Sequence, residues 1–133
     1  MKAITVRQPW AWAIINAGKN IENRNWKTHF RGRVAIHAAV GMTRDEYEDA
    51  CEDIKRISRK MKIPLYEDLE RGAIIGTVEI IDCVQDSNSP WFLGEYGFVL
   101  ECPKRLPEPI PCKGALSFWN VPPNIESRIK KAI

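Results

Sequence analysis

Three charged side chains of complementary sign follow a short apolar segment near residue 18. Lys19 comes directly after Gly18, and Glu22 and Arg24 follow it two residues apart. In an extended segment, residues two apart share a face, so this carboxylate and this guanidinium can pair. Such a cluster can hold a phosphate or a base edge, and burial would lower the pKa of the lysine. The alternative is a surface ion pair, which contributes little to stability.

Aromatic residues interleave with basic ones over the same stretch. Aromatic faces stack on bases and cations contact phosphates, a combination typical of proteins that bind single-stranded nucleic acid. Trp10 lies on the apolar face of a predicted helix, where core packing is the simpler role. Trp26 lies between Asn25 and Lys27 and is the better candidate for an exposed stacking platform.

Basic residues are concentrated in the first quarter of the chain. Residues 1–33 contain seven basic side chains and one acidic one, a net charge of +6, whereas the whole chain carries +3. The asymmetry predicts a positive face that attracts an anion such as a nucleic acid or a nucleotide phosphate. Chance clustering on a solvated surface is the alternative.

Two further residues are candidates for chemistry. Glu79 lies between apolar neighbours, so it needs a partner such as Lys19 or Arg24 if buried, and it can act as a base if it faces a cavity. His37 lies in an apolar strand-like segment and is either a structural residue or a catalyst. The four cysteines form no C-x-x-C pair, and we find no phosphate-binding glycine loop. We therefore expect no metal and no cofactor, and we expect the cysteines to be buried apolar residues.

The elements that must position these residues alternate between strand-like and helix-like patterns. Gly18 suits the end of the first helix, and Gly76 suits a bulge in a long strand. Thr43 and Glu46 form a capping box, and alternating prolines after residue 106 suit an edge strand. Extended segments are predicted at 3–7, 19–26, 33–38, 73–84, 96–102 and 106–112, and helices at 9–17, 43–62 and 124–132.

The length of 133 residues suits a single domain over residues 1–133. Five or six strands with two or three helices predict an α+β fold, a small mixed β-barrel with flanking helices. No apolar run approaches the roughly 20 residues of a membrane span, and we see no secretory signal. We expect a cytoplasmic location, and the sequence leaves the oligomeric state open.

Several stretches, in this order, resemble the ASCH (activating signal cointegrator homology) domain family, a branch of the PUA-like β-barrels. They are Gln8–Ala11, Gly18–Lys19 with Glu22 and Arg24, Trp26, Arg31–Arg33, Ile36–Ala38, Gly76–Val78, Ile81–Cys83, Tyr96–Phe98, Lys113–Gly114 and Trp119. The resemblance covers most of the chain. It implies a PUA-like barrel of about six strands with a cleft beside the first helix.

The resemblance also implies that RNA or another nucleic acid binds in that cleft. The expected ligand-binding residues are Gln8, Trp10, Lys19, Glu22, Arg24, Trp26, Arg33 and His37. Some compact relatives are credited with ribonuclease activity or with hydrolysis of acylated nucleosides. In the hydrolytic members the cleft lysine works with a hydroxyl residue three positions on and a carboxylate from elsewhere. Lys19 and Arg24 match the family pattern, but Glu22 stands at the hydroxyl position.

Two functions follow from the sequence. The favoured hypothesis is a module that binds RNA or single-stranded nucleic acid through a basic, aromatic-lined cleft. The alternative is a small hydrolase that acts on RNA or on a nucleoside-like small molecule, with Lys19, Glu22 and Glu79 as the catalytic residues. A purely protein-binding role is a third and weaker interpretation.

Overall fold

The computed structural model describes all residues, 1–133, as one six-stranded sheet with three α-helices. The strands are β1 (Lys2–Val6), β2 (Ile21–Arg24), β3 (Gly32–Ala38), β4 (Ala73–Val84), β5 (Tyr96–Pro111) and β6 (Phe118–Asn120). The helices are α1 (Trp10–Asn16), α2 (Arg44–Ile57), α3 (Pro123–Ala132) and a 3-10 turn, η1 (Tyr66–Asp68). The strand order is β2-β5-β4-β3-β1-β6, in which only β1 and β3 run parallel. The predicted α+β class with a mixed sheet is confirmed.

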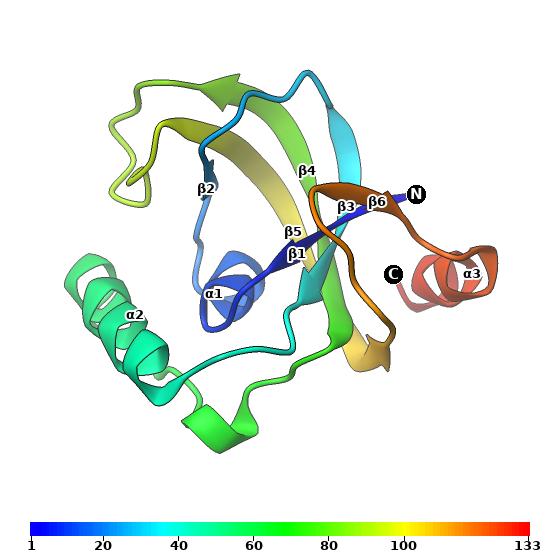
Figure 1. The fold of residues 1–133 in the computed structure, drawn as a ribbon, viewed down its shortest axis with the longest axis horizontal. Coiled ribbons are helices and arrows are strands. Elements are labelled where there is room, and N and C mark those ends of the chain that lie inside the picture. The colour runs from blue at the N-terminus through cyan, green and yellow to red at the C-terminus, as the bar shows by residue number, and fades with distance from the viewer.

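The sheet curls around α1 and forms an open half-barrel (Figure 1). Ala11, Ile14 and Ile15 face the strands at helical spacing and are buried in the main core. On the other side of the helix, Ala13 packs in a second cluster with Ile54 of α2. Burial on both sides explains why a helix of only seven residues is stable, since isolated helices of this length are not.

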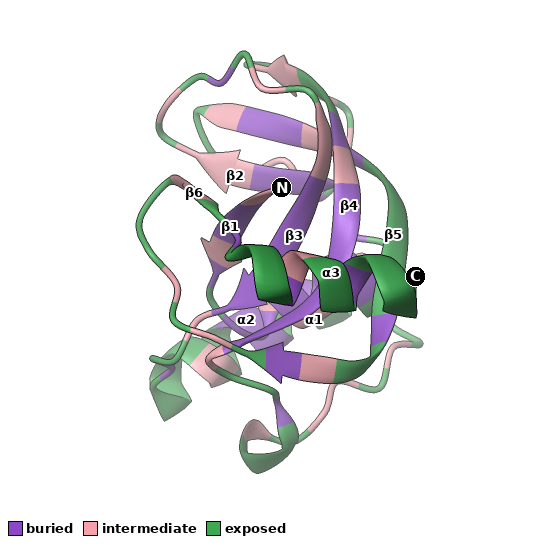
Figure 2. Cartoon of the chain, turned by 90° about the vertical axis from the view of Figure 1, so that its right-hand side faces the viewer, coloured by how far each residue is buried: buried purple, intermediate pink, exposed green.

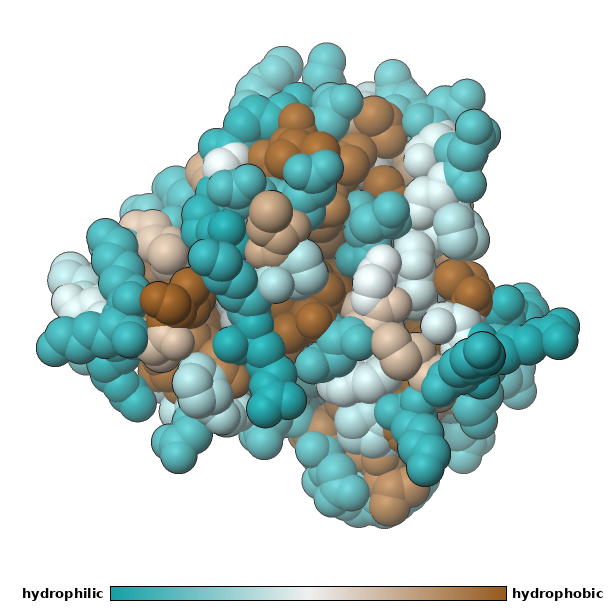
Figure 3. Space-filling model, turned by 180° about the vertical axis from the view of Figure 1, so that it is seen from behind, coloured by the Kyte–Doolittle hydropathy of each residue, from teal (hydrophilic) through white to brown (hydrophobic).

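The helix α3 covers the outer face of the sheet. Ile125 and Ile129 pack there against Ala35 of β3 and Ile74 of β4, and Figure 2 shows the opposite side of α3 exposed along its length. Seen from behind, the molecule is largely hydrophilic, with the largest apolar patch in the upper and central part of that face and smaller ones toward its sides and bottom (Figure 3). None of the helices combines the length and the apolar content needed to cross a lipid bilayer.

The second helix is shorter than the sequence predicts. It begins after Thr43, whose hydroxyl accepts a hydrogen bond from the amide of Glu46, as the capping box predicts. It ends at Ile57 and not near residue 62, because Ser58 leaves the helical conformation. The chain then turns back, so that Met61 packs against the cluster between α1 and α2.

The two strands predicted at 96–102 and 106–112 are one continuous strand, β5. Cys102 adopts a left-handed backbone conformation with φ of 51°, and the register with β4 shifts there, so the chain forms a bulge where a break was expected. The predicted irregularity at Gly76 is confirmed by a second register shift. A Cβ on Gly76 would lie 2.5 Å from the carbonyl oxygen of Lys104, so the two strands approach closely there.

The four cysteines are all free thiols, but the expectation that they are buried holds for Cys51 alone. Cys83 and Cys112 are half-buried. Cys102 is exposed because it lies in the bulge of β5, beyond the residues of β5 that pair with β2.

Candidate ligand-binding site

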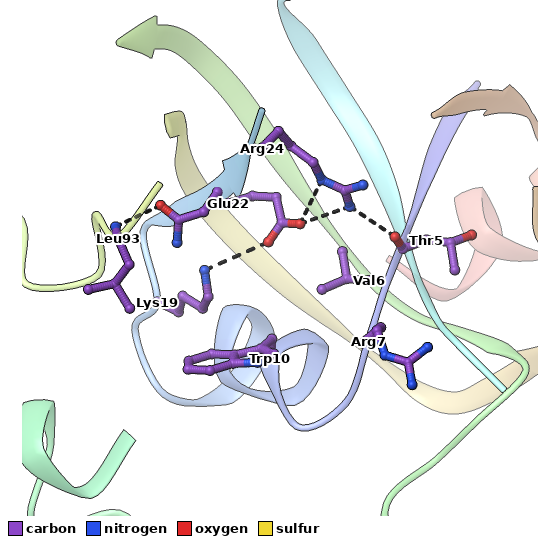
Figure 4. A pocket seen from close by; sticks show the side chains of 9 residues that line it. Thr5, Val6, Arg7, Trp10, Lys19, Glu22, Arg24 and Leu93 are labelled. Carbon is purple, nitrogen blue, oxygen red and sulfur yellow. Dashed lines mark hydrogen bonds and ion pairs between the residues drawn. The ribbon is translucent and has the colours of Figure 1, made fainter. Parts of the chain in front are cut away.

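The two edge strands of the sheet, β2 and β6, do not pair with each other. A pocket lies beside α1, between β2 and the end of β1. Its volume is about 380 Å³. The lining residues come from β1 and the residue after it, from α1, from the turn between α1 and β2, from β2, and from the loop between β4 and β5 (Figure 4). They are Thr5, Val6, Arg7, Trp10, Lys19, Glu22, Asn23, Arg24 and Leu93.

The structure brings Lys19, Glu22 and Arg24 together in this pocket. One carboxylate oxygen of Glu22 accepts from Nε of Arg24 at 2.9 Å and lies 2.8 Å from its terminal nitrogen. The other oxygen lies 3.7 Å from Nζ of Lys19. Nζ also donates to the carbonyl oxygen of Ile21. Glu22 therefore lies between two cations, and its side chain is only 10% exposed.

Local backbone geometry positions these three side chains. Gly18 adopts a left-handed conformation with φ of 73°, which suits glycine. The turn lets the amide of Lys19 donate to the carbonyl oxygen of Ala13, 3.1 Å away. Pairing of β2 with β5 then holds the next residues extended, so Glu22 and Arg24 share one face.

Burial lowers the pKa of Lys19. The side chain is 3% exposed, and loss of hydration lowers the pKa of its ammonium. The nearby Glu22 carboxylate opposes this lowering of the pKa, and the positive charge of Arg24 adds to it. The indole of Trp10 lies 5.7 Å from Nζ, a distance at which the ring attracts a cation.

The pocket walls are held by hydrogen bonds that the sequence does not reveal. The guanidinium of Arg24 donates to the carbonyl oxygen of Thr5 and so bridges β2 and β1. The side-chain amide of Asn23 donates to the carbonyl oxygen of Trp91 and accepts from the amide of Leu93. Leu93 is thereby placed at the pocket mouth, where it is 63% exposed. Side chains alternate along β2, so Asn23 points to the other face of the strand from Glu22. No signal in the sequence marks Leu93 as a residue of the pocket.

The two candidate tryptophans are both half-buried and differ in their relation to the pocket. Trp10 packs against the core, as predicted, and also lines the pocket. Trp26 lies against the main core, and its ring makes edge contacts with Phe98 at 5.1 Å and with Phe118 at 5.7 Å. Trp26 therefore closes the gap between the edge strands and does not line the pocket.

Glu79 and Arg33 lie outside the pocket and face each other across β4 and β3. Their charged groups are 3.7 Å apart, so Glu79 has Arg33 as its partner and neither Lys19 nor Arg24. Arg33 also donates to the hydroxyl of Thr77.

His37 and Gln8 are both buried, and their side chains form hydrogen bonds that join parts of the fold. The ring of His37 bonds the hydroxyl of Thr5 at 3.2 Å and the carbonyl oxygen of Cys112 at 2.7 Å. The side chain of Gln8 donates to the carbonyl oxygen of Glu70 and accepts from the amide of Trp12. Neither residue lines the pocket.

Four carboxylates, three of them from beyond residue 33, neutralise much of the basic N-terminal region. Five of its seven basic residues lie within ion-pair distance of a carboxylate. The pairs are Arg7 with Glu46, Lys19 and Arg24 with Glu22, Arg31 with Asp82, and Arg33 with Glu79. The pocket keeps a positive excess because two cations share the single carboxylate of Glu22. No group of three or more histidine, cysteine or acidic side chains lies together in a way that could hold a metal ion.

A curled six-stranded mixed sheet around a short helix, with a polar pocket at its open side, defines a PUA-like domain. The model of the ASCH domain matches residues 4–107, and the chain belongs to the ASCH domain family.

Comparison with known proteins agrees with this assignment. The chain is 26% identical to human and 24% identical to mouse Activating signal cointegrator 1, over 98% of its own length. It spans only 24% of the length of these curated relatives. The crystal structure of ASCH from Zymomonas mobilis has the same fold, with a TM-score of 0.59 over 98% of this chain and 93% of that chain, at 15% identity.

Proposed function

We propose that this chain binds RNA or another single-stranded nucleic acid, and that one nucleotide of the ligand enters the pocket beside α1. The observation that carries the proposal is the buried cluster of Lys19, Glu22 and Arg24 next to the indole of Trp10. A carboxylate accepts hydrogen bonds from the exocyclic amine of a base, and an indole offers a face for stacking. ASCH domains are generally proposed to bind RNA, which agrees with this chemistry.

The size of the pocket supports the binding of a single nucleotide. Its volume of about 380 Å³ lies near the lower end of the roughly 300–1,000 Å³ found for small-molecule sites. A base with its sugar fits such a volume, whereas a tract of several nucleotides needs a longer groove. The remaining affinity for a polymer must come from phosphates outside the pocket, so we expect it to be sensitive to salt.

Fluorescence anisotropy with single-stranded RNA and DNA oligonucleotides of the same sequence tests the proposal. We expect binding at low ionic strength that weakens steeply as salt rises, because cation–phosphate contacts release counterions. Trp10→Leu should weaken binding by about 1–3 kcal/mol, the range measured for loss of one base–aromatic stack.

Arg24→Gln and Arg33→Gln form a matched pair for the same experiment. Each arginine is paired with one glutamate, and their side chains are 22% and 28% exposed, but only Arg24 lines the pocket. We expect the Arg24 variant to lose more affinity than the Arg33 variant. The proposal is wrong if neither RNA nor DNA binds at low salt, or if the two variants lose affinity equally.

The buried lysine favours hydrolysis as a second candidate function. A lowered pKa makes the amine of Lys19 easier to deprotonate, and Glu22 lies beside it. Either group can take a proton from a water molecule that attacks an acyl carbon, while Arg24 stabilises the developing negative oxygen. The one hydroxyl group among the lining residues, that of Thr5, is already bonded to His37 and to Trp119. Water is therefore the nucleophile that this pocket favours.

A screen of acetylated nucleosides and RNA oligonucleotides for turnover tests the second candidate. We expect product formation by the wild type that disappears in Lys19→Ala. Circular dichroism of the variant shows whether its fold survives. Unchanged turnover in a folded Lys19→Ala protein would eliminate the hydrolytic mechanism, and binding without turnover would leave the first function alone.

A further inference from the structure

Arg7 occupies a distinctive position at the rim of the pocket. It follows the last residue of β1 and lies across the pocket from Leu93, with its guanidinium turned away from Glu22 (Figure 4). The sequence gives no reason to separate this arginine from the other basic residues near it.

The present partner of Arg7 is Glu46, in the first turn of α2. Nε and one terminal nitrogen of Arg7 donate to a single carboxylate oxygen of Glu46, at 2.8 and 2.6 Å. An arginine has five N–H donors, so this contact leaves three of them free. The side chains of Arg7 and Glu46 are 53% and 43% exposed, and ion pairs at such exposure are weak enough for another anion to displace.

The surface beyond Arg7 is acidic. A second depression of about 260 Å³ adjoins the pocket, and Arg7 and Trp10 line both of them. The far side of this depression carries three carboxylates of α2, those of Glu46, Asp49 and Asp53. Asp53 is paired with Arg56 at 2.8 Å, but Arg7 is the one cation that lines both depressions. Like charge opposes the passage of a phosphate chain over the carboxylates, so a ligand phosphate that leaves the pocket on this side meets Arg7 at its rim.

We infer that Arg7 is a phosphate-binding residue of the pocket and that it exchanges Glu46 for one phosphate group of the bound nucleotide. This inference rests on the proposed function. A phosphate offers several acceptor oxygens to the planar donors of a guanidinium, whereas Glu46 now offers one. Glu46 therefore competes with the ligand for Arg7.

The experiment compares Arg7→Gln with Glu46→Gln. Both substitutions remove the same ion pair, so a purely structural role would change the binding of an RNA oligonucleotide in the same direction in both variants. The proposed role moves them in opposite directions. Arg7→Gln should weaken binding several-fold and lower the slope of log affinity against log salt by about one, as expected for loss of one phosphate contact. Glu46→Gln should strengthen binding, because it releases Arg7 and removes a competing negative charge.

Arg44→Gln is the control for net charge. Arg44 also belongs to α2 and pairs with Glu67 at 2.9 Å, at a similar exposure, but it does not line the pocket. Its substitution should change affinity much less than that of Arg7. Provided that the wild type binds the oligonucleotide, two results would overturn the inference. One is an equal loss of affinity in Arg7→Gln and Arg44→Gln, and the other is weaker binding by Glu46→Gln than by the wild type. Failure of the proposed function looks different, because the wild type itself would then bind no oligonucleotide.

Discussion

At the scale of single residues, the pocket depends on a carboxylate shared by two cations. Glu22 satisfies the guanidinium of Arg24 and partly compensates the buried ammonium of Lys19. Removing one member of a buried charged group leaves the others without compensation, which costs more than the group contributes as a whole. The pocket should therefore be more sensitive to the loss of Glu22 than exposed ion pairs are to the loss of their acids.

Glu22→Gln should lower the free energy of unfolding by about 3 kcal/mol, because Lys19 would stay buried without a negative charge beside it. Glu79→Gln is the matched control, since it removes the acid of the more exposed pair with Arg33 and should cost only about 0–1 kcal/mol. Urea unfolding of both variants measures the difference. If both variants lost the same free energy of unfolding, burial would not explain the greater sensitivity to the loss of Glu22.

The charge state of Lys19 gives a prediction about pH. Burial lowers the pKa of Lys19 in the folded protein, while the unfolded chain keeps a lysine pKa of about 10.4. Between these two pKa values the unfolded state holds a proton that the folded state has released. The contribution of Lys19 to stability therefore increases as pH rises through this window. Urea unfolding should show the increase in the wild type and not in Lys19→Met.

NMR of the lysine side chains checks the same pKa directly. The Cε resonance of Lys19 should titrate at lower pH than those of the exposed lysines. Glu22→Gln should lower the pKa of Lys19 further, because the carboxylate opposes the effect of burial. Titration of Lys19 together with the surface lysines would contradict the prediction.

At the scale of elements, the free edge of β5 is protected by proline. The amide of Cys112 donates to the carbonyl oxygen of Gly72, on the side of β4. Since donors alternate along a strand, the nitrogens of Pro109 and Pro111 face the opposite, unpaired edge, where proline has no hydrogen to donate. The sequence predicts this edge correctly from the alternation of prolines, and an edge without donors resists pairing with a second chain.

Replacing both Pro109 and Pro111 with threonine should restore two donors to this edge and promote association between copies of the chain. Sedimentation velocity at increasing concentration measures the effect. Pro90→Thr is the control, because Pro90 is exposed in a loop and no strand edge gains a donor there. The same sedimentation behaviour in the double variant and in the wild type would show that the prolines do not protect the edge.

At the scale of the whole molecule, side chains close the half-barrel where backbone pairing does not. Phe118 of β6 contacts Trp26, just beyond β2, and its ring stacks at 6.0 Å on Phe98 of β5. Arg24 adds a hydrogen bond from β2 to the carbonyl oxygen of Thr5 in β1. The pocket exists because these contacts bridge the gap while α1 fills the interior, so its shape depends on aromatic packing away from the pocket itself.

Phe118→Ala should therefore weaken the attachment of β2. We expect a loss of about 3 kcal/mol, at the lower end of the range for truncating a packed phenylalanine. Amide hydrogen exchange in β2 should accelerate more than exchange in β3 and β4. Leu116→Ala is the control, because Leu116 is 94% exposed and its loss should change stability by less than about 0.5 kcal/mol. Uniform acceleration across the sheet would contradict a local role.

The sequence by itself determined the features that depend on neighbouring residues. Proline and glycine positions bound the first helix, and strand alternation places Glu22 and Arg24 on one face. Hydrophobic patterning predicts the α+β class and most of the strands. These features are readable because hydrogen bonding and side-chain direction within an element repeat with a fixed period along the chain.

Only the tertiary structure decided which of these side chains form the pocket. Three features depend on contacts between segments that are far apart in the sequence. They are the burial of Lys19, the position of Trp10 rather than Trp26 in the pocket, and the pairing of Glu79 with Arg33. The contact of Arg7 with Glu46 likewise joins the residue after β1 to α2 across 39 positions. Charge and residue type show that a side chain can form an ion pair. Which residue becomes its partner depends on the curvature of the sheet and on the packing of α1 within it.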